Sequence, residues 1–234
     1  MDTATLAAMR TLDRVLAPAL AVPALDRIPV DQFLSHLGEY RTVLGLKHPE
    51  LAADLGRQEV ALSRAPAALR ASLVRALVDD DAGDVYDLSA ELGVAPELLY
   101  LVGQMAVRPY LWAYARGQTP PGAPGGIHCP VCGRKAHMGH IDADNIKFLH
   151  CPACETVWRT ARVGCPTCGT TDPQYVGYLS VEGDAEHRVE YCTACGGYLK
   201  VVDQRVRGRR PDWLLEDAET EVLDQLAVAE GYHK

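Results

Sequence analysis

The chain has 234 residues, of which 48% are hydrophobic and 23% charged, and its formal net charge is -8 at pH 7. This composition excludes a disordered or collagen-like chain, and the length allows one large domain or several small ones. An acidic chain also lacks the phosphate-neutralising surface that nucleic-acid binding needs. The local exception is a basic stretch with Arg205, Arg207, Arg209 and Arg210, which we interpret as a solvated turn balanced by the acidic residues 216–221.

The first half of the chain has the apolar periodicity of helices, with the first predicted around residues 3–16. Later helices are predicted to begin at residues that suit a helix N-terminus, namely Asp31, Pro49, Pro66 and Pro96. The last of these helices covers residues 97–115 and contains Pro109, which should kink or split it because proline has no backbone N–H. Charged side chains interrupt the apolar N-terminal stretch, unlike a signal peptide, and no run of about 18 apolar residues is present. We therefore expect a cytoplasmic protein without membrane insertion.

A linker follows at residues 119–126, because the surrounding sequence GQTPPGAPGG is rich in proline and glycine. Beyond it the apolar periodicity changes to short β-type runs, predicted at residues 148–149, 156–158, 174–179, 188–191 and 198–202. This region forms an internal repeat in outline, since each half has a cysteine pair, a β stretch and a second cysteine pair. Residues 211–231 are predicted to form one closing helix, capped by Gly231.

All eight cysteines lie in this second half, in four C-x-x-C pairs. The pairs are Cys129/Cys132, Cys151/Cys154, Cys165/Cys168 and Cys192/Cys195. Two such pairs supply the four thiolates of a tetrahedral metal site. The intervening lengths favour sequential pairing, which gives one site from the first two pairs and another from the last two, although interleaved pairing remains possible. The donor set admits Zn²⁺ or a rubredoxin-type iron.

A fully cysteine-ligated ion has no open position for water, which favours a structural metal over a catalytic one. A glycine follows the second cysteine in three of the pairs and permits the left-handed backbone of such a turn, whereas Glu155 stands at that place in the remaining pair. Neighbouring histidines are not needed as ligands, namely His128, His137, His140 and His150. The sequence also lacks the common catalytic motifs.

The order of these elements resembles the formate dehydrogenase accessory (formation) protein family, FdhE, over essentially the whole chain. The stretches that carry the resemblance are residues 108–111, 129–133, 149–154, 165–169 and 190–200, together with Trp158, Arg162 and the ending at residues 230–232. The resemblance implies a cytoplasmic, non-enzymatic protein that binds the catalytic subunit of respiratory formate dehydrogenase before its export. It also implies a helical domain, two rubredoxin-like domains and iron bound by the eight cysteines.

The combined expectation is an α+β multidomain protein. Its segments are a helical domain at 1–118, a linker at 119–126, rubredoxin-like or zinc-ribbon-like metal domains with four cysteines each at 127–163 and 164–210, and a C-terminal helix at 211–234. The expected function is maturation and assembly of formate dehydrogenase through two four-cysteine iron sites, with zinc as the alternative metal. The alternative functions are a zinc-ribbon nucleic-acid-binding protein and a rubredoxin-like electron carrier.

Overall fold

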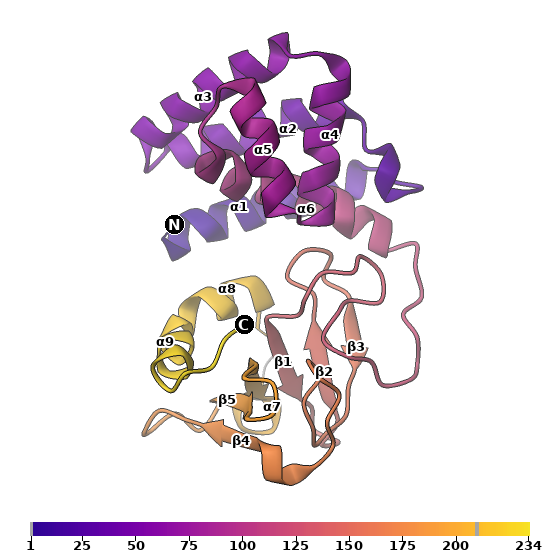
Figure 1. The fold of residues 1–234 in the computed structure, drawn as a ribbon, viewed down its shortest axis with the longest axis vertical. Coiled ribbons are helices and arrows are strands. Elements are labelled where there is room, and N and C mark those ends of the chain that lie inside the picture. The colour runs from indigo at the N-terminus through magenta and orange to yellow at the C-terminus, as the bar shows by residue number, and fades with distance from the viewer. Residues whose placement is uncertain (1, 209–210) are drawn as a thin grey trace. The chain divides into compact units, whose positions relative to one another are not determined.

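The structure, a computed structural model, describes residues 2–208 and 211–234. The chain divides into two compact units, Met1–Gly117 and Gln118–Lys234. The first is helical and the second contains the sheet and all the cysteines (Figure 1). Within the described residues, no helix is both long enough and apolar enough to span a membrane.

The helical unit consists of six α-helices and two short 3-10 turns among its described residues. These are α1 Thr3–Leu16, α2 Val30–Gly45, α3 Pro49–Arg64, α4 Ala67–Asp79, α5 Ala82–Leu92 and α6 Pro96–Ala115, with η1 Ala17–Ala19 and η2 Leu25–Arg27. Helix α6 is central and packs against the other five α-helices. Fully buried apolar side chains such as Phe33, Leu55 and Val102 form the core.

Two of the sequence predictions for this unit are wrong in detail. Asp31 is not an N-cap, because α2 begins at Val30 and Pro29 occupies the capping position. The Asp31 carboxylate instead accepts a hydrogen bond from Arg70 at 3.0 Å. Of the two outcomes predicted for Pro109, the split does not occur, since α6 continues through it to Ala115. Packing of α6 against its five neighbours offsets the loss of one backbone hydrogen bond.

In the second unit, six strands form one continuous sheet among the described residues, in the order β3-β2-β1-β6-β5-β4. Their bounds are β1 Met138–Ile141, β2 Lys147–His150, β3 Val157–Arg159, β4 Val176–Leu179, β5 His187–Cys192 and β6 Tyr198–Asp203, with η3 Pro173–Tyr175 before β4. Adjacent strands are antiparallel except β1 and β6, which are parallel. Strand β1 has no counterpart among the predicted runs.

The internal repeat predicted from the sequence corresponds to two similar halves of the sheet. Each half runs through a C-x-x-C turn, two strands, a second C-x-x-C turn and a third strand, so β1, β2 and β3 correspond to β4, β5 and β6. Both halves have the same internal strand order, and β1 of the first half pairs with β6 of the second. The two halves are therefore neighbouring copies in one sheet.

The C-terminal region covers one face of this sheet (Figure 1). It contains α7 Gln204–Arg207, α8 Trp213–Glu219 and α9 Glu221–Ala229. The single predicted helix is thus wrong, because the chain breaks between α8 and α9 at Thr220. The cap is as predicted: Gly231 has φ +88°, and the Tyr232 N–H donates to the Ala227 carbonyl oxygen as in a Schellman motif.

Candidate metal centres

The structure brings the eight cysteines together as two groups of four. The first four-cysteine group consists of Cys129, Cys132, Cys151 and Cys154. In each group all four Sγ atoms lie within 4.8 Å of one another. The groups follow the sequential pairing, so each half of the repeat has its own.

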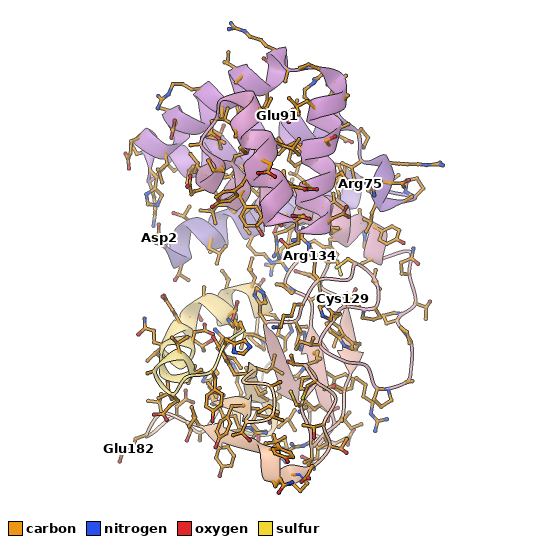
Figure 2. The ribbon with its side chains drawn as sticks, viewed as in Figure 1. Asp2, Arg75, Glu91, Cys129, Arg134 and Glu182 are labelled. Carbon is orange, nitrogen blue, oxygen red and sulfur yellow. The ribbon has the colours of Figure 1, made fainter. Side chains whose placement is uncertain are left out.

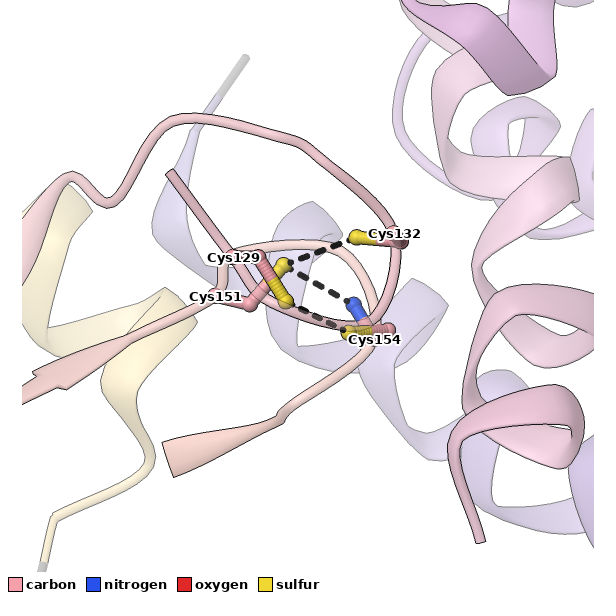
Figure 3. A group of neighbouring side chains, drawn as sticks. All are labelled: Cys129, Cys132, Cys151 and Cys154. Atoms are coloured by element: carbon pink, nitrogen blue, oxygen red, sulfur yellow. Dashed lines mark hydrogen bonds between the residues drawn. The ribbon is translucent and has the colours of Figure 1, made fainter. Parts of the chain in front are cut away.

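In the first four-cysteine group the Sγ atoms converge between two loops (Figure 3). Cys129 Sγ lies 3.6 Å from Cys154 Sγ, and Cys132 Sγ lies 3.4 Å from Cys151 Sγ. A disulfide bond would require about 2.05 Å. A tetrahedral ion with metal–sulfur bonds of about 2.3 Å separates its sulfurs by about 3.8 Å. The donor set and its spacing therefore fit one tetrahedral metal ion.

The second four-cysteine group consists of Cys165, Cys168, Cys192 and Cys195. Cys165 Sγ lies 3.7 Å from Cys195 Sγ, and Cys168 Sγ lies 3.9 Å from Cys192 Sγ. These separations fit the same coordination. The second group is more open to solvent, because Cys168 is exposed, whereas three cysteines of the first group are buried and Cys132 is half-buried.

The four C-x-x-C turns share one backbone conformation. The residue after the second cysteine has positive φ in each of them: +79° at Gly133, +78° at Gly169, +72° at Gly196 and +61° at Glu155. In the three glycine turns, the glycine N–H donates to the carbonyl oxygen of the first cysteine at 2.8–2.9 Å. Glu155 therefore adopts the left-handed conformation at the cost that its side chain imposes.

Backbone N–H groups also point at the sulfurs. Cys151 Sγ accepts from the Cys154 N–H at 3.4 Å, Cys195 Sγ from the Gly197 N–H at 3.4 Å, and Cys129 Sγ from the Val131 N–H at 3.5 Å. Such donors favour the thiolate form that a metal requires.

The close packing of sulfurs makes the thiols of the first group unequal. Hydrogen bonds from neighbouring thiols, that of Cys132 foremost, lower the pKa of Cys129. Hydrogen bonding with the neighbouring thiols instead raises the pKa of Cys151, and the contact with Cys129 is the largest cause. In the second group, burial raises the pKa of Cys165, and the Thr170 backbone N–H lowers the pKa of Cys168.

The histidines near the cysteines belong to other contacts, as expected from the sequence. His128 Nδ1 lies 3.0 Å from the Gly133 carbonyl oxygen, and His137 Nδ1 lies 3.3 Å from Asp217 Oδ2. His140 Nδ1 and His150 Nε2 lie 2.6 Å apart. Within the part of the chain that the structure describes, the candidate metal groups contain cysteines alone.

Comparison with known proteins shows that part of this chain is similar in sequence to FdhE proteins. The family model for the central domain of FdhE matches residues 128–162, which include the first four-cysteine group. The FdhE homolog of Aquifex aeolicus is 32% identical over 113 residues, covering 46% of this chain and 39% of that protein. The FdhE homolog of Yersinia pestis is 32% identical over 130 residues, covering 52% and 41%.

A solved structure extends the likeness to the fold. The crystal structure of the FdhE protein from Pseudomonas aeruginosa superimposes with a TM-score of 0.55 at 20% identity, and the match covers 88% of this chain and 94% of the other. The chain is therefore similar to FdhE proteins, in sequence over about half of its length and in fold over most of it. Its matches to the curated FdhE proteins of Aquifex and Yersinia span about two fifths of their length.

The residues that carried the FdhE resemblance in the helical unit have structural roles. Arg108 is buried in α6 and donates to Asp13 on α1 at 3.0 Å, while Tyr40 on α2 donates to the same carboxylate. Tyr110 pairs with His36 Nδ1 at 2.8 Å. These buried polar contacts link three helices of the helical unit.

Two fully buried lysines have structural roles that the sequence analysis did not assign, although Lys200 lies in a stretch that carries the resemblance. Lys147 on β2 contacts Glu190 on β5 at 2.9 Å, which joins the two halves of the sheet. Lys200 on β6 pairs with Asp217 and Asp224 at 2.7 and 2.6 Å, which fixes α8 and α9 to the sheet. Each lysine lies within an apolar run, and that placement was the available signal in the sequence.

The C-terminal helices also contribute an aromatic contact beside the first four-cysteine group. The Trp213 ring stacks on the His150 ring with centroids 3.7 Å apart and on the His140 ring at 5.2 Å. Since His150 directly precedes Cys151, this stack supports the second turn of the first group. Sequence periodicity places Trp213 on the apolar face of a helix and gives no link to the cysteines.

The basic stretch divides in the structure. Arg207 pairs with Glu216 on α8, as the charge balance suggested. Arg205 instead pairs with Asp203 and donates to Asn145 at 2.9 Å. Arg209 and Arg210 lie outside the described residues, as does the end of the segment predicted at 164–210.

Proposed function

We propose that this chain is a cytoplasmic, non-enzymatic accessory protein that binds the catalytic subunit of a respiratory formate dehydrogenase during its maturation. The observation that carries the proposal is the pair of four-cysteine groups in an FdhE-type fold. The partner comes from the resemblance of the whole chain to the formate dehydrogenase accessory family.

The proposal assigns one metal ion to each four-cysteine group, held by Cys129, Cys132, Cys151 and Cys154 in the first and by Cys165, Cys168, Cys192 and Cys195 in the second. A bound ion would supply a cross-link between two loops in each half of the repeat. Four thiolates fill a tetrahedral shell, which supports binding and assembly over hydrolysis at the metal. Iron is the proposed metal and zinc the alternative, since both accept this donor set.

The test is an anaerobic affinity capture with the tagged protein in its own host, with the captured proteins identified by mass spectrometry and the metal by elemental analysis. We expect a formate dehydrogenase catalytic subunit to be captured. Cys129→Ser with Cys132→Ser should lose the metal of the first group and the captured subunit. Val131→Ala, in the same turn but outside the ligand set, is the matched control and should keep both.

Two results would contradict the proposal. Capture of nucleic acid or ribosomal proteins with zinc and without a dehydrogenase subunit would favour a zinc-ribbon nucleic-acid-binding protein. A reversible iron couple that turns over with a reductase, again without a dehydrogenase subunit, would favour an electron carrier.

A further inference from the structure

Strand β4 ends the sheet with one side unpaired. Among the described strands its neighbour is β5, with Val176 opposite Cys192. The Cys192 N–H donates to the Gly197 carbonyl oxygen, on the side of β5 that faces β6. Backbone hydrogen bonding alternates along an antiparallel pair, so Val176 and Tyr178 direct their polar backbone groups away from β5. The Tyr178 N–H and C=O therefore form an open edge for another strand.

A cleft of about 230 Å³ adjoins this edge. Val176 and Tyr178 of β4 and Arg188 and Glu190 of β5 line it on one face of the sheet, opposite the face covered by α9. The loop at 162–164 forms its other wall. Tyr178 is 70% exposed, which gives the cleft an accessible aromatic surface beside the open edge.

The charged residues that line the cleft, together with Lys147 buried beneath it, sum to a positive charge. Glu190 accepts from the buried Lys147 at 2.9 Å and from Arg188 at 2.7 Å, so two cations share one carboxylate. Arg162 donates to the neutral amide oxygen of Asn145 at 3.0 Å and adds a further positive charge. This local excess stands out on a chain whose net charge is -8.

Two acidic side chains of this part of the sheet do not oppose this positive charge. Asp203 lies within electrostatic reach of Arg188, but Arg205 holds its carboxylate through a hydrogen bond of 2.8 Å. Glu182, in the turn between β4 and β5, points away from the sheet (Figure 2). The cleft therefore offers Arg162 and Arg188 to an acidic ligand.

We propose that β4 and this cleft bind an extended acidic segment of a partner polypeptide, which adds a strand to the sheet at Tyr178. Alternate side chains of an extended segment point to the same face, so its carboxylates would meet Arg162 and Arg188 while its backbone pairs with β4. The inference adds a peptide-binding site to the chain and does not depend on the identity of the partner in the proposed function.

The test uses the full metal-loaded chain and a short fluorescein-labelled peptide of alternating valine and glutamate, followed by fluorescence anisotropy. We expect saturable binding that weakens with added salt, and no binding of the matching valine–lysine peptide. Arg162→Gln should weaken binding by about tenfold. Arg57→Gln, at an exposed arginine of the helical unit, should leave binding unchanged.

Backbone pairing is tested by comparing Tyr178→Pro with Tyr178→Ala. Both remove the aromatic ring, but proline also removes the outward N–H, and an edge strand tolerates it there. Tyr178→Pro should bind at least about fivefold more weakly than Tyr178→Ala. Equal binding by these two variants, or by the two peptides, would overturn the proposal. Preferential binding of an oligothymidylate would also overturn it, because the cleft would then be a nucleic-acid site.

Discussion

Replacing Glu155 by glycine should stabilise the second turn of the first four-cysteine group. Glu155 has φ +61° at the position where the other three turns have glycine. The left-handed conformation costs an ordinary L-residue about 1–2 kcal/mol, whereas the greater freedom of glycine in the unfolded chain costs about 0.4–1 kcal/mol. Glu155→Gly should therefore be about 0.5–1 kcal/mol more stable than Glu155→Ala, which loses the same side-chain contacts and keeps the strain.

Thermal unfolding of the metal-loaded chain, followed by circular dichroism, measures this difference. For a chain of this size, it corresponds to a melting temperature about 1–4 °C higher for Glu155→Gly than for Glu155→Ala. Gly133→Ala is the reverse experiment, because a Cβ there meets no atom within 4 Å and adds backbone strain alone. It should destabilise by a similar amount. The prediction is wrong if Glu155→Gly melts at or below Glu155→Ala, or if Gly133→Ala melts like the unmodified chain.

Three further predictions concern the rest of the molecule. Gly103→Ala should destabilise the helical unit by about 1–3 kcal/mol in urea unfolding, because the new Cβ would lie 2.8 Å from the Leu77 side chain. Gly38→Ala is the control and should be neutral or stabilising, because its Cβ would lie no closer than 3.8 Å to the Glu59 side chain. The Glu216 carboxylate raises the pKa of His187, so His187 should stabilise the fold fully below pH about 6.5 and lose that effect as pH rises through its folded pKa. The unmodified chain should therefore have a higher urea midpoint than His187→Gln at pH 6, and this difference should shrink by pH 9. A difference that stays constant over this range would contradict the prediction. A graded chelator titration should remove the metal of the second four-cysteine group first, because that group contains the exposed Cys168. Elemental analysis of variants in which the cysteines of one group are replaced by serine measures the loss from the other group. Earlier loss from the first group would contradict the prediction.

The cysteine groups could be predicted from the sequence because the information is local. Each C-x-x-C pair is a single turn, and the lengths between pairs favoured the sequential grouping that the structure has. The sequence also indicated a left-handed residue after the second cysteine of each turn, where three turns have glycine. Glu155 adopts the same left-handed conformation without being glycine. Glycine is therefore not required for the left-handed conformation, although it makes that conformation less costly.

The remaining features depend on contacts between distant residues. Strand β1 was missed because Gly139 and His140 are weak strand formers, and the strand exists because β2 and β6 pair with it on both sides. A Cβ at Gly139 would lie 2.8 Å from the Phe148 carbonyl oxygen, so the close approach of β2 itself requires glycine. No pattern within residues 138–141 indicates that β2 and β6 lie on either side of this strand.

The buried lysines explain why two similar halves make one sheet. A repeat of small metal-stapled meanders could fold as two independent pieces, since each half has its own four-cysteine group. Lys147 of the first half opposes this separation, because it is fully buried in the folded sheet unit and its carboxylate partner Glu190 belongs to the second half. Removing Glu190 from the intact sheet would leave this lysine buried without its carboxylate partner, a change that costs about 3–5 kcal/mol in measured cases. The ion pair and the parallel β1–β6 pairing therefore couple the two four-cysteine groups through a shared sheet.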